Sequence, residues 1–309
     1  MGALLHSNVE GVALVFEGGG MRASYSSGVL NALLEGEVHF DWVGGISAGS
    51  SCTANYLSRD QRRAERSFTD FAGEANFGGL GSWVRGKGMF HAEWIYEQTS
   101  GPDQVLPFDF DAYSANPAGC AIGAIRCTDG EMVYWGREEL ATRQALMKRV
   151  RASSTMPLLM PWTDIDGVPY CDGALGPTGG FAVDAARAAG YDRFVVVLTR
   201  PRGYRKTAVR SERTMRTLLR RFPAVARGLI DRPRNYNRTL DELHELERHG
   251  RAHLVFPDEM PIGNSERNLA RLRTMYQRGL VQGRRELAAI RDFVGLPQPP
   301  ATEGQLARD

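Results

Sequence analysis

The chain has 309 residues, of which 42% are hydrophobic and 24% are charged, which is enough to bury a full core in one large domain or in one domain with an extension. The net charge is only +2, no run of about 18 apolar residues occurs, and the N-terminus lacks a basic region followed by an apolar stretch. These features argue against a membrane span and a signal peptide, and we expect a cytoplasmic protein.

The four cysteines are scattered through the chain and embedded in strand-like or helix-like patterns. They are Cys52, Cys120, Cys127 and Cys171. Their spacing does not match that of a zinc or iron site, and it does not suggest a secreted disulfide framework. We therefore expect buried thiols in a reducing compartment, and no cofactor.

Predicted strands and helices alternate along the first two thirds of the chain. In chain order they are strand 12–16, helix 24–35, strand 40–44, helix 48–58, helix 91–98, hairpin 119–135, helix 138–151, hairpin 162–171, helix 183–189 and strand 194–199. This alternation predicts a layered α/β sheet. The run of valines at 195–197 is typical of a central strand that is buried on both faces.

A glycine-rich turn follows the first predicted strand and leads into a helix. Gly18, Gly19 and Gly20 are consecutive, and Met21 and Arg22 come next. Three glycines expose backbone N–H groups that no side chain screens, at the positive end of a helix dipole. An oxyanion that forms during acyl transfer needs such donors, and Arg22 could steady the loop or the charge.

A second tight turn, at residues 45–49, has the form GxSxG between an apolar run and a helical segment. This is the context of a nucleophile elbow, in which a strained serine points away from the sheet. The strain is tolerable only if the flanking residues are small, as Gly45, Ala48 and Gly49 are. The pattern predicts Ser47 as a nucleophile.

A different function is possible for the first turn, because Gly18, Gly20 and Ala23 also spell the GxGxxA fingerprint of dinucleotide-binding proteins. That fingerprint requires an acidic residue at the end of the second strand. Asp41 has roughly the right spacing but precedes its strand. The dinucleotide-binding alternative therefore stays open.

A serine nucleophile needs a base, and the six histidines offer no convincing one. The order Ser47, Asp172 and then His244 or His253 matches the triad order of α/β-hydrolases, but that fold places its serine after several strands. Asp172 is the better candidate, because it stands where a strand ends in an Asp-Gly-Ala turn. The Asp-Gly dipeptide alone carries little information, since it recurs in two predicted hairpin turns.

Four short blocks together resemble the motifs of the patatin-like phospholipases. These motifs are a GGGxRG loop, a GxSxG elbow, an Ala-Ser-x-x-x-Pro block and an Asp-Gly-Ala/Gly turn; here they occupy residues 18–23, 45–49, 152–157 and 172–174. The resemblance covers roughly residues 10 to 200. It departs from the family pattern at Ala23, where a glycine is usual and a side chain restricts positive φ.

The resemblance implies a three-layer α/β/α patatin-like sheet and a carboxylic ester hydrolase that acts on lipid esters, above all phospholipids. It implies a dyad in which Asp172 takes the Ser47 proton without an imidazole, and apolar surroundings would make that carboxylate a better base. The implied site comprises catalytic Ser47 and Asp172, the oxyanion-hole residues Gly18, Gly19, Gly20, Met21, Arg22 and Ala48, and the elbow residues Gly45 and Gly49. A catalytically silent lipid-binding descendant remains an alternative.

Positive charge is concentrated in residues 200–238, which carry 13 Lys or Arg and two acidic residues. Apolar residues recur there at i, i+3, i+4 and i+7, which predicts an amphipathic basic helix. The four are Met215, Leu218, Leu219 and Phe222. This helix could lie on an anionic membrane, or its apolar stripe could pack on the domain. Few aromatic residues are present for stacking on bases, so no nucleic acid is expected.

The C-terminal third resembles the extension of bacterial cytosolic patatin-like proteins. The resembling segments are residues 231–238, a helix at 239–248, a strand at 253–256 and a helix at 265–287. We therefore expect a catalytic domain at 10–200, a basic helical extension at 201–296 and a disordered tail at 297–309. Trp83, Met89, Phe90 and Trp94 could form a mobile apolar lid or belong to the core.

Overall fold

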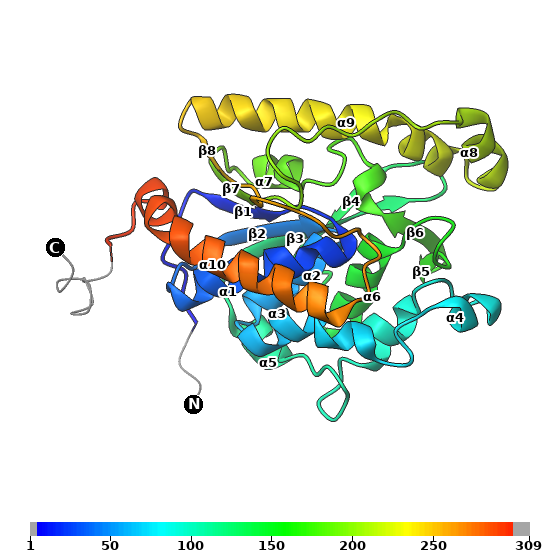
Figure 1. Ribbon diagram of the computed structural model, residues 1–309, viewed down its shortest axis with the longest axis horizontal. Coiled ribbons are helices and arrows are strands. Elements are labelled where there is room, and N and C mark those ends of the chain that lie inside the picture. Colours follow the sequence, from blue (N-terminus) through cyan, green and yellow to red (C-terminus); the bar gives the residue numbers. More distant parts are fainter. Residues whose placement is uncertain (1–4, 299–309) are drawn as a thin grey trace.

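The computed structural model describes residues 5–298, apart from the side chains of Leu80 and Trp83 (Figure 1). The strands are β1 (Ala13–Phe16), β2 (Trp42–Ile46), β3 (Gly119–Arg126), β4 (Met132–Trp135), β5 (Thr163–Ile165), β6 (Val168–Asp172), β7 (Phe194–Val197) and β8 (Ala252–Val255). The α-helices are α1 (Ala23–Glu35), α2 (Ala48–Leu57), α3 (Gln61–Ser67), α4 (Leu80–Val84), α5 (Phe110–Ala115), α6 (Arg143–Ser154), α7 (Val183–Ala188), α8 (Glu212–Leu218), α9 (Pro223–Arg248) and α10 (Leu269–Val294). Four shorter helical turns are η1 (Gly20–Arg22), η2 (Asp70–Gly73), η3 (Trp94–Gln98) and η4 (Gly173–Leu175).

A single eight-stranded sheet forms the centre of the molecule. Its strand order is β5-β6-β3-β2-β1-β7-β8, and β4 also pairs with β3. Five neighbouring strands run parallel to one another: β3, β2, β1, β7 and β8. Strands β4 and β6 run antiparallel to β3. Every residue of β1 and β7 is buried, as expected for parallel strands covered on both faces.

Helices cover both faces of this sheet (Figure 1). Helices α1, α2, α3 and α10 lie on one face and share its core with α6. Helices α7 and α9 cover the other face, where a second core cluster forms. The predicted three-layer α/β/α arrangement is confirmed, and so are the two predicted hairpins, which are β3–β4 and β5–β6.

The C-terminal extension is built into this sandwich. Its strand β8 pairs with β7 and completes the sheet, and its helix α10 crosses α1 at close range. A Cβ on Gly279 would stand 2.0 Å from the Tyr25 carbonyl oxygen, and a Cβ on Gly28 would stand 2.2 Å from that of Tyr276. Because neither glycine carries a side chain, the backbones of the two helices can touch. Helix α10 thereby braces the helix that begins just after the glycine-rich loop.

The predicted amphipathic helix at residues 215–222 is shorter than expected. Helix α8 ends at Leu218, and α9 begins at Pro223 after a break. The residue before a proline is driven out of the helical region, and Phe222 has φ −131° and ψ 79°. Leu219 and Phe222 are buried in a cluster with Cys171, whereas Leu218 is 56% exposed. Among the described residues, no helix is both long and apolar enough to cross a membrane.

Candidate active site

The sheet topology explains how two distant segments of the chain meet. Strand β2 pairs with the first part of β3, so that Ile46 lies opposite Gly123. Strand β6 pairs with the last part of β3 from the opposite direction, so that Asp172 lies opposite Ala124. Because Gly123 and Ala124 are consecutive, β2 and β6 point at each other, and the residues that follow them lie together.

Ser47 occupies the tight turn between β2 and α2. Its φ of 57° and ψ of −128° are rare for a residue with a side chain, as the elbow pattern predicted. The close approach of the flanking backbone requires small neighbours. A Cβ on Gly45 would stand 2.2 Å from the Gly49 carbonyl oxygen, and one on Gly49 would stand 2.2 Å from that of Phe16.

The side chains of Ser47 and Asp172 are in direct contact. The Ser47 hydroxyl donates to Asp172 Oδ2 at 2.7 Å, and the Ala174 N–H donates to Oδ1 at 2.9 Å. Burial raises the pKa of the Asp172 carboxyl, while the charge of Arg232 and these hydrogen bonds oppose that shift. A carboxylate with a raised pKa is a stronger proton acceptor than a free aspartate. This arrangement can remove the proton from the serine hydroxyl.

The Ala-Ser-x-x-x-Pro block holds both of these residues in place. Ser153 Oγ accepts a hydrogen bond from the Ser47 N–H at 2.8 Å and donates one to the Gly123 carbonyl at 2.6 Å. The Thr155 carbonyl accepts one from the Asp172 N–H at 2.8 Å. The sequence marked this block through the family resemblance, but nothing in its composition revealed these partners.

The six predicted oxyanion-hole residues lie along the loop after β1 and at the start of α2, but their N–H groups differ in availability. Three are engaged by backbone carbonyls: Gly18 by Gly180 at 3.2 Å, Met21 by Asn264 at 2.9 Å and Arg22 by Gly19 at 3.3 Å. Among residues 5–298, the N–H groups of Gly19, Gly20 and Ala48 have no acceptor. Only these three donors are therefore available to a bound oxyanion.

The loop geometry shows why the departure at Ala23 is harmless. Ala23 has φ −67° and ψ −3°, which any residue adopts in a right-handed helix. The positive φ occurs instead at Gly20, with 56°. A Cβ on Gly20 would also stand 2.4 Å from the Asn264 carbonyl oxygen, because the C-terminal extension packs against the loop.

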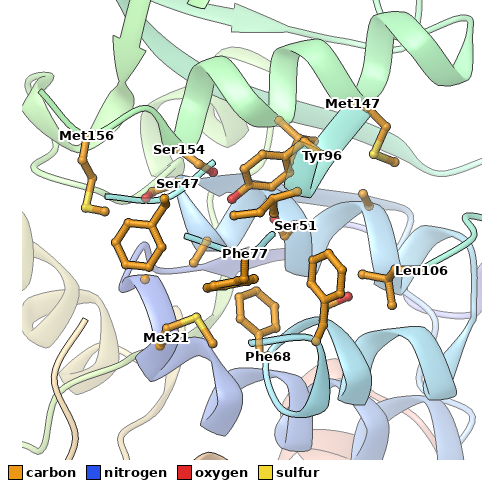
Figure 2. Close-up of a pocket in the computed structure, with 18 of the residues that line it drawn as sticks. Met21, Ser47, Ser51, Phe68, Phe77, Tyr96, Leu106, Met147, Ser154 and Met156 are labelled. Carbon is orange, nitrogen blue, oxygen red and sulfur yellow. The ribbon is translucent and has the colours of Figure 1, made fainter. Parts of the chain in front are cut away.

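A predominantly apolar pocket opens beside Ser47, and its outline contains about 810 Å³ of unoccupied space, open solvent included. Figure 2 shows Ser47 and Met21 toward one side of it and Leu106 and Met147 toward the other. Its apolar lining comes from distant parts of the chain: Met21, Ala48, Ala54, Phe68, Phe71, Phe77, Phe90, Ile95, Leu106, Met147, Val150, Met156 and Met160. Of the aromatic residues considered as a lid, Phe90 lines this pocket and is buried, and Trp94 stacks on Phe71 at 5.3 Å between ring centroids.

The residues that the dinucleotide-binding and histidine-triad alternatives require lie away from this site. Asp41 precedes β2 and accepts a hydrogen bond from the Gly11 N–H, so it lies at the amino ends of the strands, whereas the glycine loop lies at their carboxyl ends. None of the residues that line the pocket is a histidine. His244 and His253 instead face Glu247 and Glu286 at 3.4 and 3.6 Å.

A family model described as patatin-like phospholipase matches residues 14–182, which is more than half of the chain. The chain therefore belongs to the patatin-like phospholipases, a family of lipid hydrolases. A second model, described as a domain of unknown function (DUF6363), matches residues 222–295.

Individual relatives are more distant. The uncharacterized protein YjjU of Escherichia coli (strain K12) is 26% identical over 193 residues, which are 62% of this chain and 52% of that protein. The chain thus spans about half the length of this curated relative. The crystal structure of VipD from Legionella pneumophila aligns with 90% of this chain and 67% of its own, with 12% identity and a TM-score of 0.46.

Proposed function

We propose that this protein is a serine acyl hydrolase that cleaves ester bonds of lipids, phospholipids above all, with Ser47 as nucleophile and Asp172 as base. The observation that carries the proposal is the 2.7 Å hydrogen bond from the Ser47 hydroxyl to a buried carboxylate. The strained elbow supports it, because strain of this kind persists where it serves a function. Membership of a lipid hydrolase family supports the substrate class.

The mechanism follows from the groups around the serine. Asp172 Oδ2 accepts the hydroxyl proton while Ser47 Oγ bonds to the ester carbonyl carbon, and the carbonyl oxygen becomes an oxyanion. The N–H groups of Gly19, Gly20 and Ala48 donate to it. Collapse of the intermediate breaks the ester C–O bond, and Asp172 returns the proton to the leaving alcohol.

A water molecule then completes the cycle. Asp172 accepts a proton from this water, whose oxygen attacks the carbonyl carbon of the acyl-enzyme. The second tetrahedral intermediate uses the same three donors. Its collapse breaks the bond to Ser47 Oγ, which regains its proton from Asp172, and the fatty acid leaves.

The apolar pocket beside Ser47 suits an acyl chain. Its methionine side chains are unbranched and adaptable, and its phenylalanine rings add apolar surface. Each methylene buried there contributes roughly 0.8 kcal/mol to binding. We assign the acyl chain of the substrate to this pocket.

We also propose that the protein docks on anionic membranes through a surface beside the pocket. Three large apolar side chains are exposed in this part of the molecule: Leu158, Leu159 and Leu218. Leu158, Leu159 and Leu218 line a shallow groove that also contains Met160, and Met160 lines the apolar pocket as well. The arginines of residues 200–238 would add attraction to anionic lipid.

A fluorophosphonate probe tests the enzyme proposal directly, because it forms a covalent bond with an activated serine. We expect one label per chain in the natural protein and none in Ser47→Ala. Labelling that persists in Ser47→Ala would place the nucleophile elsewhere. A natural protein that resists the probe and releases no fatty acid would instead be the catalytically silent lipid-binding alternative.

A further inference from the structure

Beside the candidate dyad, on the α9 side of the sheet, four cationic side chains gather from separate segments. Arg22 belongs to η1, Arg200 follows β7, Lys206 lies in the loop after it, and Arg232 belongs to α9. Their charges act on one another, and those of Arg232 and Lys206 also act on Asp172. Arg22 is only 5% exposed, while the other three are partly exposed. The group therefore has one buried member and three that solvent can reach.

These four cations lack the partners that some neighbouring arginines have. Within residues 5–298, none of their side-chain nitrogens lies within 4 Å of a carboxylate oxygen, and the buried Nε atoms of the three arginines have no hydrogen-bond partner. Some neighbours on the same segments are paired: Arg202 with Glu247, Arg205 with Asp241 and Arg234 with Asp231. Others in the described part of the chain, such as Arg220, Arg221 and Arg227, also have no carboxylate partner. The four are distinguished by acting on one another as well as by lacking a carboxylate partner.

The surroundings hold these cations in place and offset only part of their charge. Lys206 Nζ lies 4.1 Å from the centroid of the Tyr236 ring, and Arg200 Cζ lies 4.4 Å from that of Tyr204. Glu17 is a buried carboxylate within the group that accepts a hydrogen bond from the Thr199 N–H at 2.6 Å, and its single charge acts on Arg22 and Lys206. Like charges that are partly desolvated repel one another unless an anion lies between them.

The pKa of Lys206 reflects its burial and the positive charges around it. Burial, followed by the charge of Arg232, lowers the pKa of Lys206 to about 7. The same effects, with Arg200 as the leading neighbour, lower the pKa of Arg22 to about 10. An anion placed among them would raise both values again.

We propose that Arg200, Lys206 and Arg232, backed by Arg22, form a binding site for a phosphate-type oxyanion beside the Ser47–Asp172 pair. Arginine donates two parallel hydrogen bonds to a phosphate, and a protonated lysine adds a point charge. Arg232 lies in the segment that matches the domain of unknown function, so this site gives that segment a role.

The phosphate of a phospholipid headgroup is the first source to consider, and this choice rests on the proposed function. The apolar pocket is lined in part by Ala48 and Ala54 of α2, whereas Arg232 belongs to α9, and these two helices cover opposite faces of the sheet (Figure 1). Both adjoin the dyad, because Ser47 lines the pocket and the charge of Arg232 acts on Asp172. One lipid molecule could therefore place its acyl chain in the pocket and its phosphate among the cations. Free phosphate has the same chemistry and is the second source.

Calorimetry with inorganic phosphate tests the site independently of catalysis. The protein is full-length Ser47→Ala, alone and combined with Arg200→Gln, Arg232→Gln or the control Arg234→Gln, which removes the same charge from an exposed position on α9. We expect Arg200→Gln and Arg232→Gln each to weaken binding about tenfold or more, and Arg234→Gln to change it less than about twofold. Phosphate that does not bind, or that binds equally to all variants, overturns the proposal.

A second measurement distinguishes the two sources, with Ser47 intact. The hydrolysis rates of a soluble short-chain phosphatidylcholine and of the uncharged diacylglycerol with the same chains are compared in each variant. If Arg200→Gln and Arg232→Gln lose both phosphate affinity and preference for the phospholipid, the headgroup is the ligand. If they lose only phosphate affinity, free phosphate is. An enzyme inactive on both esters refutes the proposed function, while the calorimetric result still decides the anion site.

Discussion

Ser47 Oγ and Asp172 Oδ2 lie 2.7 Å apart although 125 residues separate them in the chain. The contact depends on β3, which pairs with β2 and β6 along the same edge and so directs their ends at each other. The dyad is therefore a property of the strand register. A shift of β6 by one residue would turn Asp172 to the opposite face of the sheet.

Removal of either member of the pair should abolish ester hydrolysis. We expect Ser47→Ala and Asp172→Asn each to lower kcat on a soluble p-nitrophenyl ester by at least about 10³-fold, since nucleophile and base act as a unit. Asp166→Asn is the matched control, because Asp166 occupies another Asp-Gly turn, at the β5–β6 hairpin, and is exposed. Comparable losses in the control and in Asp172→Asn would contradict the assignment.

The loss of Ser153 should disturb both stability and catalysis. Ser153→Ala leaves the Ser47 N–H and the Gly123 carbonyl without the partner they share. We expect the free energy of unfolding to fall by about 1–3 kcal/mol, the cost of buried groups left unpaired. The effect on turnover should exceed the effect on KM, because the position of Ser47 changes while the pocket does not. Urea denaturation and steady-state kinetics measure the two; an unchanged kcat would show that the elbow does not need this hydroxyl.

Activity and stability should respond to pH in opposite directions through Asp172. Burial raises its folded-state pKa above the ordinary value of 3.8, so the folded chain binds this proton more tightly than the unfolded chain does. As pH falls through the raised pKa toward 3.8, the contribution of Asp172 to stability rises, while kcat/KM falls because the base is protonated. The difference in unfolding free energy between the natural protein and Asp172→Asn, measured across this range, isolates the contribution. A difference that does not vary with pH would show that the carboxyl titrates normally.

A larger side chain at the far side of the pocket should shorten the preferred acyl chain. Leu106 lies there, away from Ser47 (Figure 2). We expect Leu106→Phe to lower kcat/KM for a decanoyl ester about tenfold relative to a butyryl ester. The phenyl ring would fill the space that the last few methylenes of the longer chain occupy. Val84→Phe adds a ring at an exposed position and should leave the ratio unchanged. Equal loss on both esters would indicate general destabilisation rather than a chain-length limit.

If the protein docks on membranes through the groove beside the pocket, substitutions there should weaken vesicle binding and substitutions elsewhere should not. The double variant Leu158→Glu with Leu218→Glu should bind vesicles containing phosphatidylglycerol about tenfold more weakly, because two apolar side chains no longer enter the interface and two negative charges are added. Val281→Glu alters another exposed apolar residue, on α10, and should bind like the natural protein. Sedimentation with vesicles measures the bound fraction, and equal binding by all three proteins would rule out this surface.

Much of the fold and part of the site could be predicted from local patterns. The alternation of strand and helix, the two hairpins and the strained turn at Ser47 depend on residues close in sequence, because hydrophobic period and small flanking residues determine them. The helix predicted at 215–222 shows where such reasoning fails. Its apolar spacing was regular, but Pro223 removed Phe222 from the helical region and divided the segment.

The sequence by itself determined the sharp turn that presents Ser47 and the chain of glycines before α1, since both follow from which backbone angles small residues permit. Only the tertiary structure decided which N–H groups of this loop remain free, because carbonyls far along the chain engage two of them: Gly180 engages Gly18, and Asn264 engages Met21. It also decided that Arg232 lies near Asp172 rather than among paired surface arginines. Hydrogen bonds and charges act through space, and the register of β3 with its neighbours sets those distances.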